Sequence, residues 1–387
     1  MAERDTDTSD APAHTAMDQF TAHLDRGWDL IHRGDLRGAQ LSAEKSIELD
    51  PQAPEAHNLL GYVKAALGQA DEALELYRQA LALDDSFVEA MLNAAEVLIH
   101  PLHDFDAAIS MIEEALDFAD GPDETADALL LKYDVSVHQG DKEGARRVSS
   151  SFPEGPFESA RLDFLVGRAF FECGEQAKAQ RLLAHAIELE PSYGDAHYTL
   201  GLVHEALGDS KGMVSSFLRA READFALPRV VWAPNRSAFE ELVRTAIARL
   251  PKPLRAAVET AELFVTELPG AEVIVDGVDP RTSVLFDTSE RIEGSHNSRT
   301  TRETTRETTR EETRVARMFF YQRNTERAVE DAISLSDEIY MVLEEELCAT
   351  FPELAPHATR PDEHGDHDHG DTDDHADNDE RDDNDGH

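Results

Sequence analysis

Histidine and aspartate alternate near the end of the chain, in the segment whose composition best suits metal chelation. His364, His367, His369 and His375 lie among thirteen acidic residues between positions 361 and 387. Imidazole is a good ligand for Zn²⁺ and Ni²⁺, and carboxylates add negative charge, so the segment could chelate such an ion weakly. We favour the alternative that this tail only increases solubility, and we expect no other cofactor.

The acidity of the whole chain restricts its partners. The 387 residues contain 36 Lys and Arg against 80 Asp and Glu, a formal net charge of −44. The tail after residue 360 carries −12 of this and residues 1–16 carry −3, which leaves −29 on the rest. This charge argues against nucleic acid or an anionic membrane and favours a basic or metal-bearing partner. An organism whose cytoplasm tolerates acidic proteins would explain it equally well.

Cysteine usage and the chain ends indicate a cytoplasmic protein. Cys173 and Cys348 are too few for a disulfide framework, which suits a reducing compartment. The first residues lack the basic and apolar regions of a signal peptide, and no apolar run is long enough to span a membrane. Neither end has a periodic apolar pattern, so we expect 1–16 and 356–387 to be disordered.

A 34-residue repeat organises the sequence from about residue 17 to 224. Small residues recur at the eighth, twentieth and twenty-seventh positions, where they let two antiparallel helices approach closely while bulky residues fill the gap. The small residues are Gly27, Ala39, Gly61, Ala73, Ala80, Ala108, Ala115, Gly167, Ala179, Ala186, Gly201 and Ala220, and Pro51 and Pro191 close the first and fifth units.

The repeat predicts six units, one of them degenerate. They cover residues 20–53, 54–87, 88–122, 123–157, 158–193 and 194–224. In the fourth, Ser149 to Ser151 and Pro153 shorten the second helix, and we expect a bend or break there. The pattern resembles the tetratricopeptide repeat (TPR) family. This implies an α-solenoid whose concave face, lined by the first helix of each pair, binds a peptide or helix of a protein partner. A rigid spacer and a self-associating array are the alternatives.

A small α+β domain follows a linker at 225–236 and extends over 237–355. We expect its first helix over 238–250, with Ser237 as the N-cap. A Thr/Arg/Glu repeat over 298–314 predicts a solvated loop inserted between two strands. The other expected elements are a short helix after Pro253, strands over 262–269, 283–287 and 315–322, and helices over 325–333 and 336–350.

The run Phe320 to Arg327 and the order of these elements resemble the small bacterial zincin-like metallopeptidase family. In that family a helix with the motif HExxH follows, whose histidines hold Zn²⁺ and whose glutamate activates water. The aligned residues here are Glu344, Glu345 and Cys348. The resemblance therefore implies that Glu345 keeps the position of the base, while Glu344 and Cys348 replace the histidines. Aligned one residue later, the motif has no second ligand.

Because neither alignment supplies a histidine, we expect this domain to be catalytically inactive. His204-Glu205 begins like the zinc motif, but Gly208 stands where the second histidine belongs. The sequence thus predicts a mainly helical bacterial-type adaptor with an inactive zincin-like domain. The alternative is a zinc metallopeptidase with non-standard ligands that recruits its substrate through the repeats.

Overall fold

The computed structural model describes residues 11–288 and 315–354, which form two compact units. Unit 1 holds the residues up to Val231 together with Glu267–Thr282, and unit 2 holds Trp232–Thr266 and the residues from Ser283 onward. The expectations for 1–10, for the Thr/Arg/Glu loop and for the histidine-rich tail lie outside the described residues. Within the described ranges, no helix is both long and apolar enough to cross a membrane.

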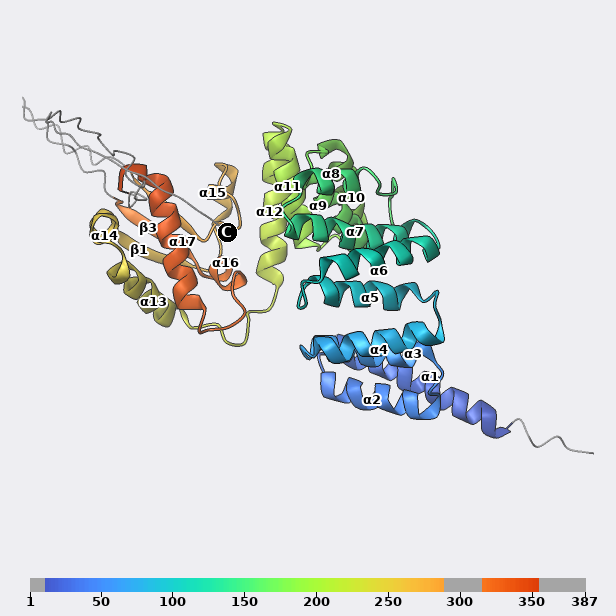
Figure 1. The fold of residues 1–387 in the computed structure, drawn as a ribbon. Helices are drawn as coiled ribbons and strands as arrows, with labels where there is room; N and C mark the ends of the chain where they lie inside the picture. Colours follow the sequence, from blue (N-terminus) through green and yellow to red (C-terminus); the bar gives the residue numbers. More distant parts are fainter. Residues whose placement is uncertain (1–10, 289–314, 355–387) are drawn as a thin grey trace, which may run out of the picture. The chain divides into compact units, whose positions relative to one another are not determined.

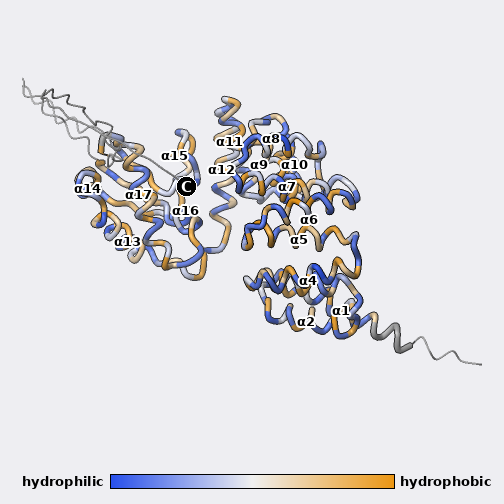
Figure 2. Tube along the Cα trace, viewed as in Figure 1, coloured by the Kyte–Doolittle hydropathy of each residue, from blue (hydrophilic) through white to orange (hydrophobic). Residues whose placement is uncertain are grey.

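Unit 1 is an α-solenoid of stacked helix pairs, as the 34-residue period predicts (Figure 1). Figure 2 shows hydrophilic and hydrophobic residues alternating along these helices, which gives each helix one face to bury. The helices in pairs are α1 (Ala11–His32) and α2 (Leu36–Leu49), α3 (Pro54–Ala66) and α4 (Ala70–Leu83), α5 (Val88–Ile99) and α6 (Phe105–Phe118), α7 (Pro122–His138) and α8 (Lys142–Ser149), α9 (Ala160–Glu172) and α10 (Gln176–Leu189), and α11 (Gly194–Ala206) and α12 (Ser210–Ala226). The helix α1 begins at Ala11, inside the segment that the sequence predicts to be disordered.

The tight turns inside the pairs are set by two residue types. A glycine with positive φ ends the first helix in five pairs, for example Gly68 at +75°. Residues with a Cβ rarely adopt this backbone conformation. The second helix then begins at a polar cap. The Oδ1 atom of an aspartate accepts a hydrogen bond from the third residue of the helix at Asp35, Asp104, Asp141 and Asp209.

The predicted small residues lie in the packed interior of the array, and Gly61 and Gly167 lie where the two helices of a pair touch. All twelve are buried in the structure. A Cβ on Gly61 would lie 2.6 Å from the ring of Tyr77, and one on Gly167 would lie 3.1 Å from Leu183. Glycine therefore permits the close approach of the two helices at these positions.

Pro51 and Pro191 occupy equivalent turns between repeats and are exposed. The carbonyl oxygen of Pro51 lies 3.0 Å from Nε2 of His57, and that of Pro191 lies 3.0 Å from Nε2 of His197. These histidines therefore tie each turn to the following helix.

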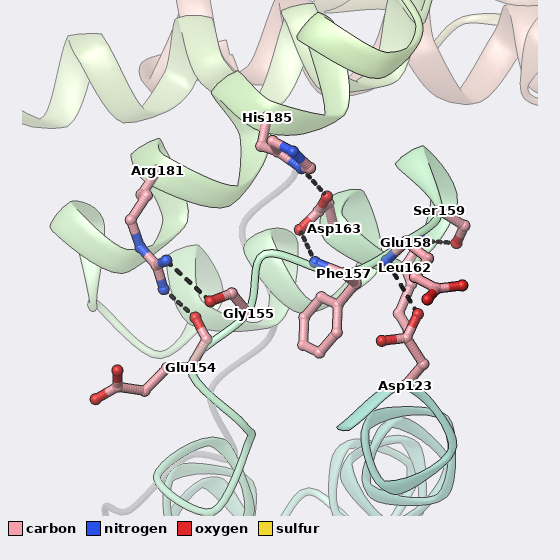
Figure 3. Close-up of polar contacts among 10 residues, drawn as sticks. All are labelled: Asp123, Glu154, Gly155, Phe157, Glu158, Ser159, Leu162, Asp163, Arg181 and His185. Carbon is pink, nitrogen blue, oxygen red and sulfur yellow. Dashed lines mark hydrogen bonds and ion pairs between the residues drawn. The ribbon is translucent and has the colours of Figure 1, made fainter. Parts of the chain in front are cut away.

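The shortened fourth repeat is completed by a loop over 150–159 (Figure 3). The fully buried carboxylate of Asp163 accepts a hydrogen bond from the N–H of Phe157 and lies 2.6 Å from Nδ1 of His185. Arg181 donates to the carbonyl groups of Glu154 and Gly155.

The same loop carries apolar side chains into the core. Phe152 and Phe157 pack in one buried cluster with residues of α7, α9 and α10. The expected interruption of the repeat pattern is present in this loop, but the hydrophobic core continues across it and does not break.

One segment of unit 1 comes from the C-terminal part of the sequence. Residues Glu267–Thr282 include the short helix α15 (Ala271–Val275) and belong with the repeat unit. This corrects the prediction of a single domain over 237–355. The helix α15 has no counterpart among the elements predicted from the sequence.

Unit 2 is built on a three-stranded sheet with the order β1-β3-β2, of which β1 and β3 are labelled in Figure 1. The strand β3 (Arg317–Tyr321) pairs in parallel with β1 (Glu262–Thr266) and antiparallel with β2 (Val284–Asp287). A buried cluster joins the sheet to the helices of the unit. The helices are α13 (Arg236–Arg249), α14 (Lys252–Val258), α16 (Gln322–Arg327) and α17 (Leu335–Thr350), and a 3₁₀ turn (Pro352–Leu354) follows.

Two details of unit 2 differ from the sequence prediction. Asn235, and not Ser237, caps α13, because its Oδ1 atom accepts the N–H of Ala238 at 3.0 Å. The helix expected over 325–333 begins and ends earlier, at Gln322–Arg327, since it follows β3 directly.

Candidate functional site

The first helices of the six pairs pack against one another in order and form a continuous face of unit 1. We call this face the groove face, and its chemistry changes along the array. Trp28 and Tyr62 are in contact at one end, with ring centroids 5.3 Å apart. Successive pairs carry Trp28, Tyr62, Glu96, Asp134, Arg168 and Leu202 at the equivalent position of the first helix, which lies six residues before the turn glycine in every pair but the third. Aromatic rings are thus followed by carboxylates and then by a guanidinium group.

A chain of hydrogen bonds joins the second and third repeats on this face. The buried amide of Asn58 donates to Oε1 of Glu89 at 3.0 Å and accepts from Nδ2 of Asn93 at 3.0 Å. Because Asn58 is almost fully buried, it fixes the side chains of both Glu89 and Asn93.

Three carboxylates of the groove face have raised pKa values; Asp127 and Asp134 are half-buried, and Glu89 is exposed but hydrogen-bonded to Asn58. Burial raises the pKa of Glu89, of Asp127 and of Asp134 above the usual carboxyl range. A raised carboxyl pKa means that the surroundings oppose the negative charge. A cation brought by a ligand would reduce that opposition.

Basic side chains of the protein itself offset the effect of burial on the pKa of these carboxyls only in part. Arg161 lowers the pKa of Asp127, and His100 and Arg168 lower that of Asp134, but in each case burial has the larger effect. Arg168 instead lies 3.5 Å from Glu172 in an ion pair. In the part of the chain that the structure describes, neither aspartate forms an ion pair.

A pocket of about 280 Å³ lies between α3 and α5. Tyr62, Tyr77 and Val97 give it apolar walls, and Asn93 and Glu96 supply polar groups. It is therefore an apolar hollow next to the carboxylates of the groove face.

At the sixth repeat the groove face already holds a cation. Arg281 pairs with Asp195 of α11 at 2.6 Å and with Asp224 of α12 at 3.1 Å. Burial alone would lower the pKa of Arg281, but its hydrogen bonds and ion pairs with these two carboxylates raise it overall. The guanidinium also lies over the ring of Tyr198. No repeat or motif in the sequence predicts this arrangement.

The three positions implied by the zincin resemblance lie on α17 and do not fit a zinc site. The hydroxyl of Tyr340 donates to Oε1 of Glu344 at 2.9 Å. Burial, followed by the charge of Glu344, raises the pKa of the Cys348 thiol, whereas zinc binds the thiolate. Glu345 is exposed. Among residues 11–288 and 315–354, no group of three His, Cys, Asp or Glu side chains is placed to hold a metal ion.

Comparison with known proteins identifies the repeats. Residues 24–87 match the family model of the tetratricopeptide repeat. This match begins inside α1 and continues through α2, α3 and α4, a span that includes Gly27, Gly61 and Ala73. No curated protein sequence matches the chain significantly.

Solved structures with a similar backbone include PilF of Pseudomonas aeruginosa, at 17% identity and a TM-score of 0.44, covering 55% of this chain and 95% of PilF. A TPR protein of Thermus thermophilus has 18% identity and a TM-score of 0.39, with coverage of 49% and 98%. YrrB, described as a TPR protein with an unusual peptide-binding site, has 19% identity and a TM-score of 0.33, with coverage of 48% and 93%. We draw no functional argument from similarity at this level.

Proposed function

We propose that the protein is an adaptor whose TPR groove binds a basic segment of a protein partner. The supporting observation is the set of carboxylates at Glu89, Asp127 and Asp134, whose pKa values are raised mainly by burial; Asp127 and Asp134 are half-buried and Glu89 is held in place by Asn58. Lysine or arginine side chains of a partner would supply positive charge beside them. An acidic segment would be repelled.

Unit 2 acts in this proposal as a non-catalytic domain. The donor set on α17 argues against the rival zinc metallopeptidase, because Glu344 and a protonated Cys348 are a poor zinc pair without any histidine. The zincin-like fold of unit 2 remains a prediction.

The proposal is tested by fluorescence anisotropy with the full chain and short labelled peptides rich in lysine or in glutamate. We expect the lysine peptide to bind, the glutamate peptide not to bind, and affinity to fall with salt. The variant with Glu89→Gln, Asp127→Asn and Asp134→Asn should bind the lysine peptide several-fold more weakly.

A matched control is needed because a chain of charge −44 attracts any polycation. Glu114, Asp117 and Glu188 are exposed on second helices, away from the groove face. Neutralising these three removes the same charge and should leave the affinity nearly unchanged. An equal loss of affinity in both triple variants would refute groove binding.

A further inference from the structure

We propose that the pocket between α3 and α5 is an anchor site for one bulky apolar side chain of the partner, with a lysine or arginine beside it at Glu96. The inference rests on the proposed function and specifies the partner segment more closely. Such a segment carries a residue like leucine or phenylalanine next to basic residues.

The size and lining of the pocket favour a single side chain. Its volume of about 280 Å³ lies just below the range of about 300–1,000 Å³ typical of small-molecule sites. Tyr62, Tyr77 and Val97 offer apolar surface, while Ala66 keeps the space open because its own side chain is small. An aliphatic or aromatic side chain is therefore a better occupant than a cofactor.

Polar groups at the pocket suit an extended backbone. The amide of Asn93 uses one N–H to reach Asn58, and an amide also has a second N–H and a carbonyl oxygen. These groups are complementary to the C=O and N–H of a peptide. Since Asn58 holds Asn93 in place, little entropy would be lost when it binds.

The negative charge beside the pocket determines which apolar segments of a partner can bind there. Glu96 lines the pocket, and Glu89 is held on the same helix by Asn58. A basic residue next to the anchor would lie near these carboxylates, whereas an acidic neighbour would be repelled. Apolar contact and charge complementarity thus act at adjacent positions of one segment.

The test compares two labelled peptides, one with a central leucine flanked by lysines and one with serine in place of the leucine. Burial of the leucine should make the first peptide bind the full chain about tenfold more tightly. Ala66→Phe fills the pocket and should abolish this preference. Ala206→Phe is the control, because Ala206 is the exposed equivalent of Ala66 in the sixth repeat and should keep the preference.

A second variant tests the same site without filling the pocket, so that the proposal can still be tested if Ala66→Phe misfolds. Glu96→Gln should weaken binding of the leucine peptide, while Glu114→Gln on α6 should not. If the wild type binds the two peptides equally, the anchor site is refuted. The proposed function still stands if both peptides bind more weakly to the variant with Glu89→Gln, Asp127→Asn and Asp134→Asn. If neither peptide binds, both proposals fail.

Discussion

The guanidinium carbon of Arg281 lies 4.3 Å from the centre of the Tyr198 ring. Tyr198 belongs to the first helix of the sixth repeat, whereas Arg281 comes from the C-terminal part of the sequence. The Tyr198 hydroxyl donates to Asp279 at 2.8 Å, so the segment is held at two nearby points. A piece of the chain thus covers the last repeat in the way that we propose a basic partner covers the middle ones.

Replacing Arg281 by alanine should release this segment. Asp224 is only 5% exposed and would lose its ion pair with Arg281, and removal of one partner of a buried ion pair is strongly destabilising. Hydrogen exchange measured by mass spectrometry should become faster over 267–282. Arg219→Ala, which breaks an exposed pair with Glu222 on the same helix, should have no such effect. Unchanged exchange in Arg281→Ala would show that the pair does not hold the segment.

The buried carboxylate of Asp163 should stabilise the folded state of the fourth and fifth repeats. Asp163→Ala leaves the N–H of Phe157 without its acceptor, at a cost of about 1–3 kcal/mol. Ser159→Ala removes only the cap of α9, at about 1 kcal/mol, and serves for comparison. Chemical unfolding followed by circular dichroism measures both. The prediction is wrong if Asp163→Ala costs no more than Ser159→Ala.

Gly61 should not tolerate a larger residue. The added methyl of Gly61→Ala would meet the ring of Tyr77, and overpacking of this kind typically costs about 1–3 kcal/mol. A second change, Tyr77→Leu, should recover part of that stability in the double variant, because leucine faces the equivalent Gly167 in the fifth repeat. Thermal unfolding of the single and double variants provides the test. If the two changes were simply additive, the clash would not be the cause.

Much of unit 1 could be predicted because its determinants are local. The spacing of Gly61, Ala73 and Ala80 predicts two helices that pack within one repeat, and the family model confirms the repeat itself for residues 24–87. The surroundings of the carboxylates of Glu89, Asp127 and Asp134 are harder to predict. Their positions follow from the repeat register, but their contacts depend on neighbouring repeats, as where Asn58 of the second repeat donates a hydrogen bond to Glu89 of the third.

The long-range features could not be predicted from the sequence. Arg281 stands in a polar turn with no periodic signal, and its partners Asp195 and Asp224 lie far away in the sequence. The N-cap of α13 was misplaced because Ser237 and Asn235 are both good cap residues. Only the geometry of the backbone selects Asn235.

Zinc should not bind at α17. We expect metal analysis of the purified chain lacking residues 356–387 to find far less than one zinc per molecule. Truncation removes the histidine-rich tail, which could otherwise bind zinc by itself. Cys348→Ser should leave the metal content unchanged. One tightly held zinc that is lost in Cys348→Ser would restore the metallopeptidase alternative.

Binding of the lysine peptide should weaken as the pH falls. The loss should begin at a higher pH than protonation of ordinary carboxylates would produce. Burial raises the pKa of Asp127 and Asp134, so these groups take up protons before exposed carboxyls, whose pKa is about 4. Loss of their charge reduces the attraction for lysine.

The same pKa shifts have the opposite effect on folding. Carboxyls with raised folded pKa values bind more protons in the folded state than in the unfolded state. Their contribution to the free energy of unfolding therefore increases as the pH falls through the raised pKa values. Anisotropy titrations and unfolding curves at a series of pH values separate the two effects. In the variant with Asp127→Asn and Asp134→Asn, affinity should be lower at neutral pH and change less with pH. Equal pH dependence in wild type and variant would exclude these carboxylates as the binding groups.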